Sequence, residues 1–203
     1  MNPNFEIKDK NIMYDVLDKV EYGTLALCVG NIPYAVPVNF VRIEDEIYFH
    51  GALSNRKMKM LAQNPKVSFS VVENYALIDS DFSTTEGLAC PATQFFKSVS
   101  IDGMAVIEES REVKEKVFEA LMHKLQPKGG YKPFSDSVYD QALKATAVVK
   151  IAIEKLTCKF KFGQHLSEER FDMIVAHLLE RGTQIDRETV KLMKEQRGIK
   201  VGI

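Results

Sequence analysis

Short β-type runs follow one another closely between residues 24 and 72 of this chain. Residues 24–29 form one such run, Gly30-Asn31 is a pair typical of tight turns, and residues 34–42 carry apolar side chains at alternate positions. A parallel βαβ unit needs a crossover of about a dozen residues, so these shorter connections favour antiparallel strands. A closed or half-closed barrel would protect the edges of such a sheet.

Four further segments complete the predicted strands. Residues 46–50 return as the third strand of a meander, and residues 67–72 follow as a strand of mixed alternation. We expect a strand or strand pair over residues 95–108 and a last strand over residues 146–153. Residues 75–93 carry no regular pattern, so we expect that stretch to be irregular.

Helical spacing of apolar residues predicts the helices. The sequence indicates a helix over residues 56–64, a long amphipathic helix capped by Ser110, a short helix over residues 136–144, and two tail helices over residues 167–182 and 186–196. The predicted fold is therefore mainly β with α: a six-stranded antiparallel split β-barrel with flanking helices. We expect a barrel domain over residues 1–163 and a C-terminal helical extension, residues 164–203, packed on the barrel.

The composition argues against several kinds of binding partner and site. The 203 residues include 27 basic and 28 acidic side chains, so the net charge of −1 creates no global field for nucleic acid or an anionic membrane. No run approaches the roughly 18 apolar residues that span a bilayer, and no signal-peptide pattern opens the chain. We expect a soluble, cytoplasmic protein. Three separated cysteines, Cys28, Cys90 and Cys158, suit reduced thiols better than a disulfide framework or a metal site.

One strand-to-helix junction has the chemistry of an anion site. Ser54, Asn55, Arg56 and Lys57 follow the third strand and open the first of the predicted helices. A helix N-terminus presents unpaired N–H groups and a partial positive charge, to which the two cations add full charges. The junction therefore predicts a phosphate-binding site. The alternative is a solvated helix start with Ser54 or Asn55 as its N-cap.

The order of these motifs resembles the FMN-binding split-barrel superfamily of pyridoxamine 5′-phosphate oxidase, and most closely its nitroimidazole-resistance (Nim-like) branch. The resemblance covers roughly residues 10–162 and rests on Leu25-Ala26, residues 33–40, residues 47–50, the Lys57 helix that ends in Asn64-Pro65, and residues 97–103. It implies a six-stranded antiparallel barrel, a homodimer, and one FMN at each of two equivalent sites between the subunits.

The resemblance also implies the site residues. One strand faces the isoalloxazine ring, a second strand end lies beside it, the junction with Lys57 holds the phosphate, and Ser98 stands where the oxidases have a glutamine that reaches the flavin from the second subunit. The predicted cofactor-binding residues are Val38, Asn39, Phe40, His50, Gly51, Ala52, Asn55, Arg56, Lys57, Ser98 and Val99.

The chain departs from the oxidase pattern in informative ways. It has one more residue between Phe49 and Lys57, and His50 stands where the oxidases have threonine. The substrate-binding arginine and histidine near the oxidase C-terminus have no counterpart, which argues against oxidation of pyridoxine phosphate.

Two classes of function follow from the resemblance. The first is an FMN-dependent oxidoreductase that takes electrons from a small-molecule donor and reduces a small acceptor, such as a nitroaromatic. His50 is its predicted catalytic residue, because imidazole titrates near neutral pH; a strand-end histidine bonded to backbone is the alternative. The second class is a non-enzymatic flavin- or haem-binding sensor whose C-terminal helices contact a partner.

Overall fold

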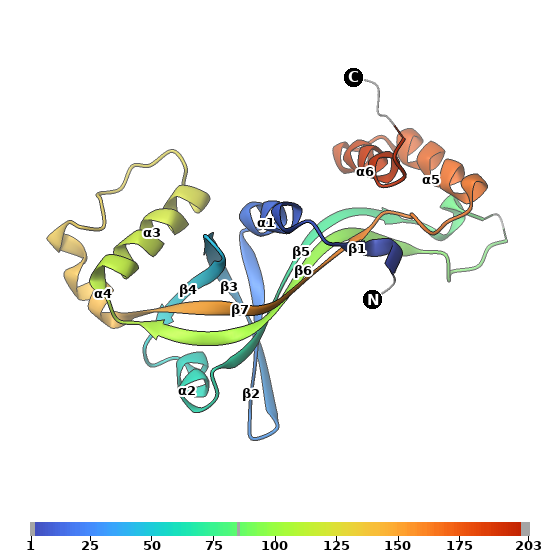
Figure 1. Cartoon of the computed structure of the whole chain (residues 1–203). Helices are drawn as coiled ribbons and strands as arrows, with labels where there is room; N and C mark the ends of the chain where they lie inside the picture. The colour runs from blue at the N-terminus through green and yellow to red at the C-terminus, as the bar shows by residue number, and fades with distance from the viewer. Residues whose placement is uncertain (1–2, 85, 200–203) are drawn as a thin grey trace. The chain divides into compact units, whose positions relative to one another are not determined.

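A computed structural model describes residues 3–84 and 86–199 of the chain (Figure 1). The strands are β1 (Glu6–Ile7), β2 (Tyr22–Val29), β3 (Ile32–Ile43), β4 (Glu46–Ala52), β5 (Lys66–Ile78), β6 (Thr93–Glu108) and β7 (Thr146–Lys161). The α-helices are α1 (Lys10–Lys19), α2 (Arg56–Gln63), α3 (Arg111–Leu125), α4 (Asp140–Ala145), α5 (Glu168–Arg181) and α6 (Gln184–Glu195). Short 3-10 helices are η1 (Pro3–Phe5), η2 (Ser80–Phe82) and η3 (Ser137–Tyr139).

The strands form one sheet that closes on itself. Their order is β1-β7-β4-β3-β2-β5-β6, and a further β7–β6 pairing completes a ring of six strands with β1 outside it. The pairs β2–β3, β2–β5, β3–β4 and β4–β7 are antiparallel. The predicted fold class, a mainly β split barrel with flanking helices, is confirmed.

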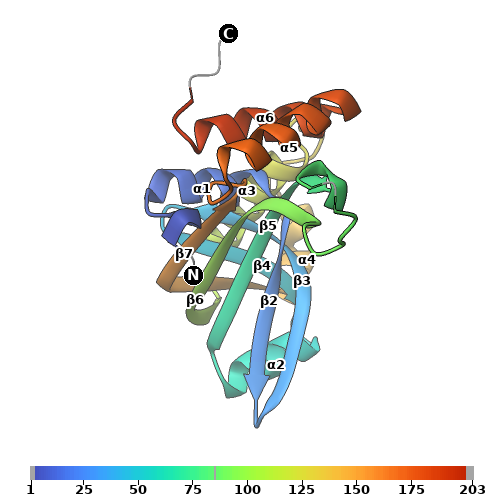
Figure 2. The same cartoon turned by 90° about the vertical axis from the view of Figure 1, so that its right-hand side faces the viewer.

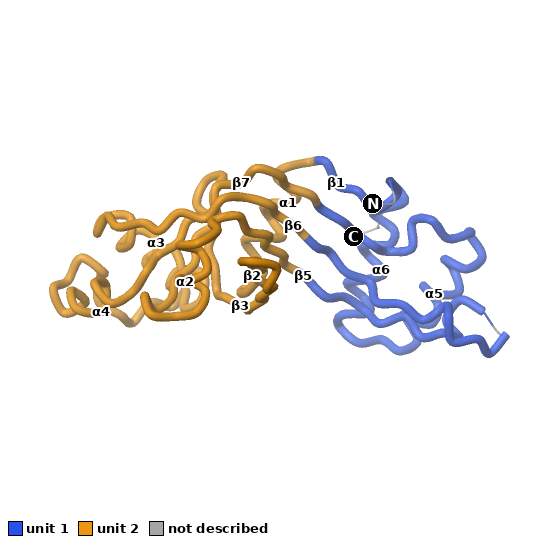
Figure 3. The backbone as a smooth tube through the Cα atoms, turned by 90° about the horizontal axis from the view of Figure 1, so that it is seen from below, with its two compact units in different colours: residues 1–8, 72–98, 158–203 blue, residues 9–71, 99–157 orange. Residues whose placement is uncertain are grey.

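The chain divides into two compact units (Figure 3). Unit 1 comprises the described residues of 1–8, 72–98 and 158–203, and unit 2 comprises residues 9–71 and 99–157. Strands β5, β6 and β7 each contribute residues to both units. The predicted domain boundary after residue 163 stays a prediction.

In unit 2, β4 is buried on both of its faces. Ile47 and Phe49 are fully buried on one face, and Tyr48, on the other, packs with Val117 and Leu121 of α3. Helix α3 thus covers the second face with the apolar stripe that the sequence shows, and Ser110 caps it through the Val113 N–H, as predicted. Burial on both faces explains the unbroken apolar run in this strand.

Strand β5 is longer than predicted, and this corrects the expectation that residues 75–93 are irregular. The strand continues to Ile78, and η2 follows it. The polar pair Glu73-Asn74 interrupts the apolar pattern, but Glu73 accepts a hydrogen bond from the Tyr75 hydroxyl at 3.0 Å and pairs with Lys97 at 3.7 Å. A paired carboxylate is tolerated within a strand, so the polar residues do not end it.

Helix α1 was not predicted from the sequence, although the signals for it exist. Asp9 caps it by accepting from the Asn11 N–H, and Met13, Val16 and Leu17 are buried at helical spacing. Lys124 in α3 links the two helices, because its Nζ donates to the Leu17 oxygen at 2.9 Å.

Lys124 is also bound to β3. Its Nζ donates to the Phe40 oxygen at 3.3 Å and lies 3.9 Å from the centre of the Phe40 ring. Burial lowers the pKa of Lys124 to about 8, although Asp18 and Glu21 favour its charged form. This ammonium group therefore joins α1, β3 and α3 at an electrostatic cost.

Replacing Lys124 with methionine should remove a pH dependence of stability. Between pH 8 and 10.5 the unfolded chain holds a proton at this residue that the folded chain has released. The free energy of unfolding should therefore rise with pH there by at most about 1.4 kcal/mol per pH unit in the wild type. Urea unfolding across this range should show a shallower rise in Lys124→Met, whereas Lys116→Met, an exposed change on the same helix, should keep the slope. Equal slopes in all three proteins would contradict this assignment.

In unit 1, α5 and α6 lie side by side as a helical hairpin (Figure 2). Ser167 caps α5, left-handed Gly182 ends it, and Thr183 and Asp186 form a capping box at the start of α6. Both tail helices were predicted from the sequence, within two residues at each end.

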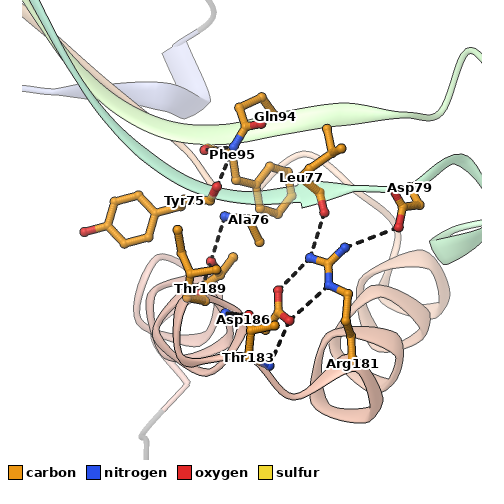
Figure 4. Close-up of polar contacts among 11 residues, drawn as sticks. Tyr75, Ala76, Leu77, Asp79, Gln94, Phe95, Arg181, Thr183, Asp186 and Thr189 are labelled. Atoms are coloured by element: carbon orange, nitrogen blue, oxygen red, sulfur yellow. Dashed lines mark hydrogen bonds and ion pairs between the residues drawn. The ribbon is translucent and has the colours of Figure 1, made fainter.

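A polar network joins this hairpin to the last part of β5 (Figure 4). The Arg181 guanidinium donates to both oxygens of the buried Asp186, at 3.0 and 2.6 Å, to the Leu77 oxygen at 2.9 Å and to Asp79 at 3.2 Å. Thr189 accepts from the Ala76 N–H at 3.1 Å. We call this network of Arg181, Asp186, Thr189 and the end of β5 the clasp, and all of its residues lie in unit 1.

Candidate functional site

The end of β4 and the start of α2 bring three predicted residues, His50, Gly51 and Lys57, together in unit 2. A Cβ atom at Gly51 would lie 2.6 Å from Lys57 Cε and 2.7 Å from Lys57 Nζ. The lysine side chain therefore rests directly on the Gly51 backbone, in space that only glycine leaves open. Its charge acts on the adjacent His50 and helps to lower the pKa of that imidazole.

Arg56, the other cation predicted for this site, points elsewhere. Its guanidinium carbon lies 4.3 Å from the centre of the Tyr34 ring in β3, at the distance of a cation–π contact. Neighbouring helix residues project about 100° apart, so Lys57 lies against Gly51 while Arg56 turns to Tyr34. Lys57 is therefore the stronger candidate for an anion contact.

The first turn of α2 offers backbone donors beside Lys57. Asn55 occupies the N-cap position, as the alternative interpretation of this segment supposed, but its side chain makes no capping hydrogen bond. The Met58 N–H donates to the Asn55 oxygen at 3.0 Å, whereas the N–H groups before it have no acceptor within the helix, and the helix dipole places partial positive charge there. The site thus combines a full charge with donors that the N-cap side chain does not satisfy.

Strand β3 carries two more predicted residues near the end of its ladder with β4. Phe40 and Phe49 form the last pair of this antiparallel ladder, and Asn39 and His50 are the next residues of their strands, with Asn39 paired to Tyr22 of β2. The Asn39 side-chain amide donates to the Glu21 oxygen at 3.1 Å, which fixes its orientation.

An open hollow of about 390 Å³ lies along this part of β3, lined by Tyr22, Pro37, Val38 and Asn39. The Tyr22 side chain is 61% exposed, so an aromatic face is available at the surface. Phe40 is fully buried and can offer a ligand only its backbone. The hollow could accept a flat, largely apolar group.

His50 packs against a cluster of aromatic rings. Its ring centre lies 5.3 Å from that of Phe118, which stacks on Phe134 at 5.4 Å, and Tyr139 stacks on Phe134 at 4.7 Å. Burial by surrounding protein atoms, and then the charge of Lys57, lower the pKa of His50 below its ordinary 6.5. The neutral imidazole is therefore the favoured form, and the side chain is exposed to solvent.

The remaining predicted residues differ in accessibility. Ala52 is exposed at the end of β4, opposite Thr146. Val99 is fully buried in β6, so its side chain is not open to a ligand, and Ser98 is half-buried. A role for Ser98 toward a second subunit stays a prediction.

Sequence reasoning missed the groups that support the site. Tyr34, which holds Arg56, resembles any strand tyrosine in the sequence, and Phe134 lies in a loop without periodicity. Lys124 looks like an ordinary cation in the last turn of a helix. The tendency of aromatic rings to pack together is the one sequence signal for the cluster around His50, and it does not tell which rings are in contact.

Residues 3–84 and 86–199 contain no group of three or more His, Cys, Asp or Glu side chains placed to hold a metal ion. None of their helices has the length and apolar character needed to cross a bilayer.

Solved structures with the same fold include three informative cases. The flavocytochrome Anf3 from Azotobacter vinelandii superposes with a TM-score of 0.67 at 22% identity, over 83% of this chain and 75% of that one. A candidate 5-nitroimidazole antibiotic resistance protein from Bacteroides thetaiotaomicron gives 0.63 at 21%, over 76% and 85%. The FAD and haem binding protein from Mycobacterium smegmatis gives 0.63 at 20%, over 77% and 73%.

At these identities the structural likeness establishes the fold alone. A search of curated protein sequences gives no match. A family model described as pyridoxamine 5′-phosphate oxidase, however, matches residues 9–160, which is most of the chain and includes every residue of the β4–α2 site. The chain belongs to the pyridoxamine 5′-phosphate oxidase family.

Proposed function

We propose that this protein is a homodimeric FMN-binding oxidoreductase that reduces a small electron acceptor, with a nitroaromatic as the first candidate. The observation that carries the proposal is the Lys57 ammonium group, held on the bare backbone of Gly51 at the start of α2 and next to His50. Membership of the family and the likeness to flavin-binding structures support it.

The residues fit a flavin phosphate. Lys57 supplies a cation, and the first turn of α2 supplies N–H donors that the Asn55 side chain leaves uncapped. The hollow along Val38 and Asn39 suits a flat ring system, because its lining is largely apolar with one fixed amide.

Bound flavin would supply the redox chemistry, since it can accept electrons from a donor and pass them to an acceptor. The chain's own contribution is orientation and proton control. His50, in its neutral form, can relay a proton: one ring nitrogen accepts a proton while the other gives up its own. The Phe118–Phe134 stack holds this ring in place.

Replacing His50 with alanine should slow electron transfer far more than it weakens flavin binding. We expect the chemically reduced flavoprotein to reduce a nitroaromatic acceptor at least about tenfold more slowly, because a positioned proton relay is lost. Stopped-flow absorbance measures this rate, and flavin fluorescence measures the FMN affinity. His50→Gln, which keeps a hydrogen-bonding group, should lie between the two proteins. An unchanged rate in His50→Ala would remove the proposed role.

The proposal as a whole is tested by titrating the purified protein with FMN. Saturable binding of one FMN per protomer, a dimeric mass in light scattering and steady reduction of an acceptor by a reduced pyridine nucleotide are the expected results. A protein that shows no flavin bands in its visible spectrum and takes up no added FMN would contradict the proposal.

A second candidate is a non-enzymatic flavin- or haem-binding sensor. It is favoured by two of the similar structures, a flavocytochrome and an FAD and haem binding protein. A Soret band in place of flavin bands, or ligand-dependent partner binding without turnover, would select this candidate.

A further inference from the structure

Unit 1 contains a half-enclosed cavity of about 230 Å³ that the proposed flavin site does not use. The end of β7, the start of α5 and the segment that leads into β6 form its walls, and Figures 1 and 2 show that segment beside α5. Phe95 and Ile174, which are 1% and 2% exposed, form its apolar part. Lys161, His165 and Arg170 form its polar part.

The Arg170 guanidinium is held in a fixed position at this cavity. Its Nε donates to the Ser83 oxygen at 3.2 Å and its Nη2 donates to Ser83 Oγ at 3.0 Å. Ser83 is only 3% exposed, so both acceptors belong to the buried part of the wall. The Nη1 group takes no part in these bonds, and a ligand would not have to order the side chain first.

The charged side chains that line the cavity, Lys161 and Arg170, are both cationic. Burial, and then the charges of Lys161, Arg170 and Arg197, lower the pKa of His165. Burial, and then Lys159, lower the pKa of Lys161, whose Nζ donates to Thr93 Oγ1. Burial and the neighbouring cations thus disfavour the protonated forms of Lys161 and His165, and a bound anion would favour these forms.

No carboxylate of the described residues lines this cavity. Glu86 lines the adjoining hollow of about 430 Å³, which shares Ser83, Cys90, Pro91 and Arg170 with it. The positive charges on the cavity wall are therefore not neutralised by an acidic side chain in that wall.

We propose that this cavity binds a small organic oxyanion: a carboxylate or phosphate carried on an apolar body. Arg170 and Lys161 recognise the oxyanion by charge-assisted hydrogen bonds, and Phe95 and Ile174 receive the apolar body. The volume is below the roughly 300 Å³ of drug-sized pockets, so the ligand is small. The site is separate from the flavin site and does not depend on the proposed function.

Calorimetric titration of the full chain with benzoate, and with inorganic phosphate, tests the proposal. We expect saturable binding of one benzoate per protomer and at least about tenfold weaker binding of neutral benzamide, which has the same shape. Lys161→Gln should weaken benzoate binding by about tenfold, and His165→Gln is a second variant at the same wall. Lys155→Gln is the matched control, because Lys155 is exposed on the same strand and lies outside the lining.

A local readout uses two exposed thiols. Cys90 lines the cavity in unit 1, whereas Cys28 lies on β2 in unit 2. Benzoate should slow the alkylation of Cys90 by iodoacetamide and leave that of Cys28 unchanged, as peptide mass spectrometry can measure in one sample. Equal protection of both thiols, or of neither, would overturn the proposal.

Flavin binding provides the remaining distinction. FMN affinity should be the same in Lys161→Gln as in the wild type, and benzoate should bind with or without FMN present. Loss of FMN affinity in Lys161→Gln would assign this cavity to the cofactor phosphate and would overturn a separate site. An absence of saturable benzoate and phosphate binding would also overturn it, whether or not the protein binds FMN.

Discussion

Replacing Lys57 with alanine is expected to weaken FMN binding by about 10- to 100-fold, because a charge-assisted hydrogen bond to the phosphate is lost. The free energy of unfolding should change little, since the ammonium group rests on the surface of Gly51 and makes no ion pair among the described residues. Quenching of flavin fluorescence measures the affinity, and urea unfolding measures the stability.

Two companion variants separate the geometry of this site from simple loss of charge. Lys59→Ala removes an exposed cation from the same helix and should leave FMN affinity nearly unchanged. Gly51→Ala keeps every charge, but its new methyl group would meet the end of the Lys57 side chain, which must move away. We therefore expect Gly51→Ala to lose FMN affinity as Lys57→Ala does. Wild-type FMN affinity in Lys57→Ala and in Gly51→Ala would contradict the proposed phosphate site.

Replacing Asp186 with alanine is expected to lower the free energy of unfolding by about 3 kcal/mol, the lower end of the range for a broken buried ion pair. The carboxylate is fully buried and accepts two hydrogen bonds from Arg181 and one from the Thr183 N–H at 3.1 Å. Its loss leaves the Arg181 guanidinium without its main partner and removes the capping box of α6. Urea unfolding followed by circular dichroism measures the change.

The pH dependence of the same carboxylate gives an independent check. The Arg181 hydrogen bonds lower the pKa of Asp186 from 3.8 to about 2. Its contribution to stability is therefore complete above the unfolded value of 3.8 and is lost as the pH falls through 2. Asp172→Ala, an exposed change on α5, is the matched control and should alter stability little. An Asp186→Ala variant as stable as this control would contradict the role of the clasp.

Local sequence signals predicted most of the fold. The Gly30-Asn31 turn is confirmed by positive φ angles of 53° and 64°, which match a tight hairpin between β2 and β3. Asn64 ends α2 as expected, and its side chain donates to the Cys28 oxygen at 2.9 Å. Such signals are readable because each depends on a few adjacent residues.

What the sequence could not supply depends on contacts between distant segments. The polar Glu73 hid the second half of β5, because its partners Tyr75 and Lys97 are assigned only by the folded chain. In the same way, the sequence places both Arg56 and Lys57 at the anion site, and the family resemblance favours Lys57 without showing where either side chain points. The contacts with Tyr34 and Gly51 separate them, and no pattern in the sequence encodes those contacts.

The central claim is that Lys57 contacts the phosphate of the flavin. The most direct measurement compares FMN with riboflavin, which lacks that phosphate, in the wild type and in Lys57→Ala. We predict that the wild type binds FMN at least about tenfold more tightly than riboflavin, and that this preference largely disappears in Lys57→Ala while riboflavin affinity is unchanged. An equal preference for FMN in the two proteins would contradict the account.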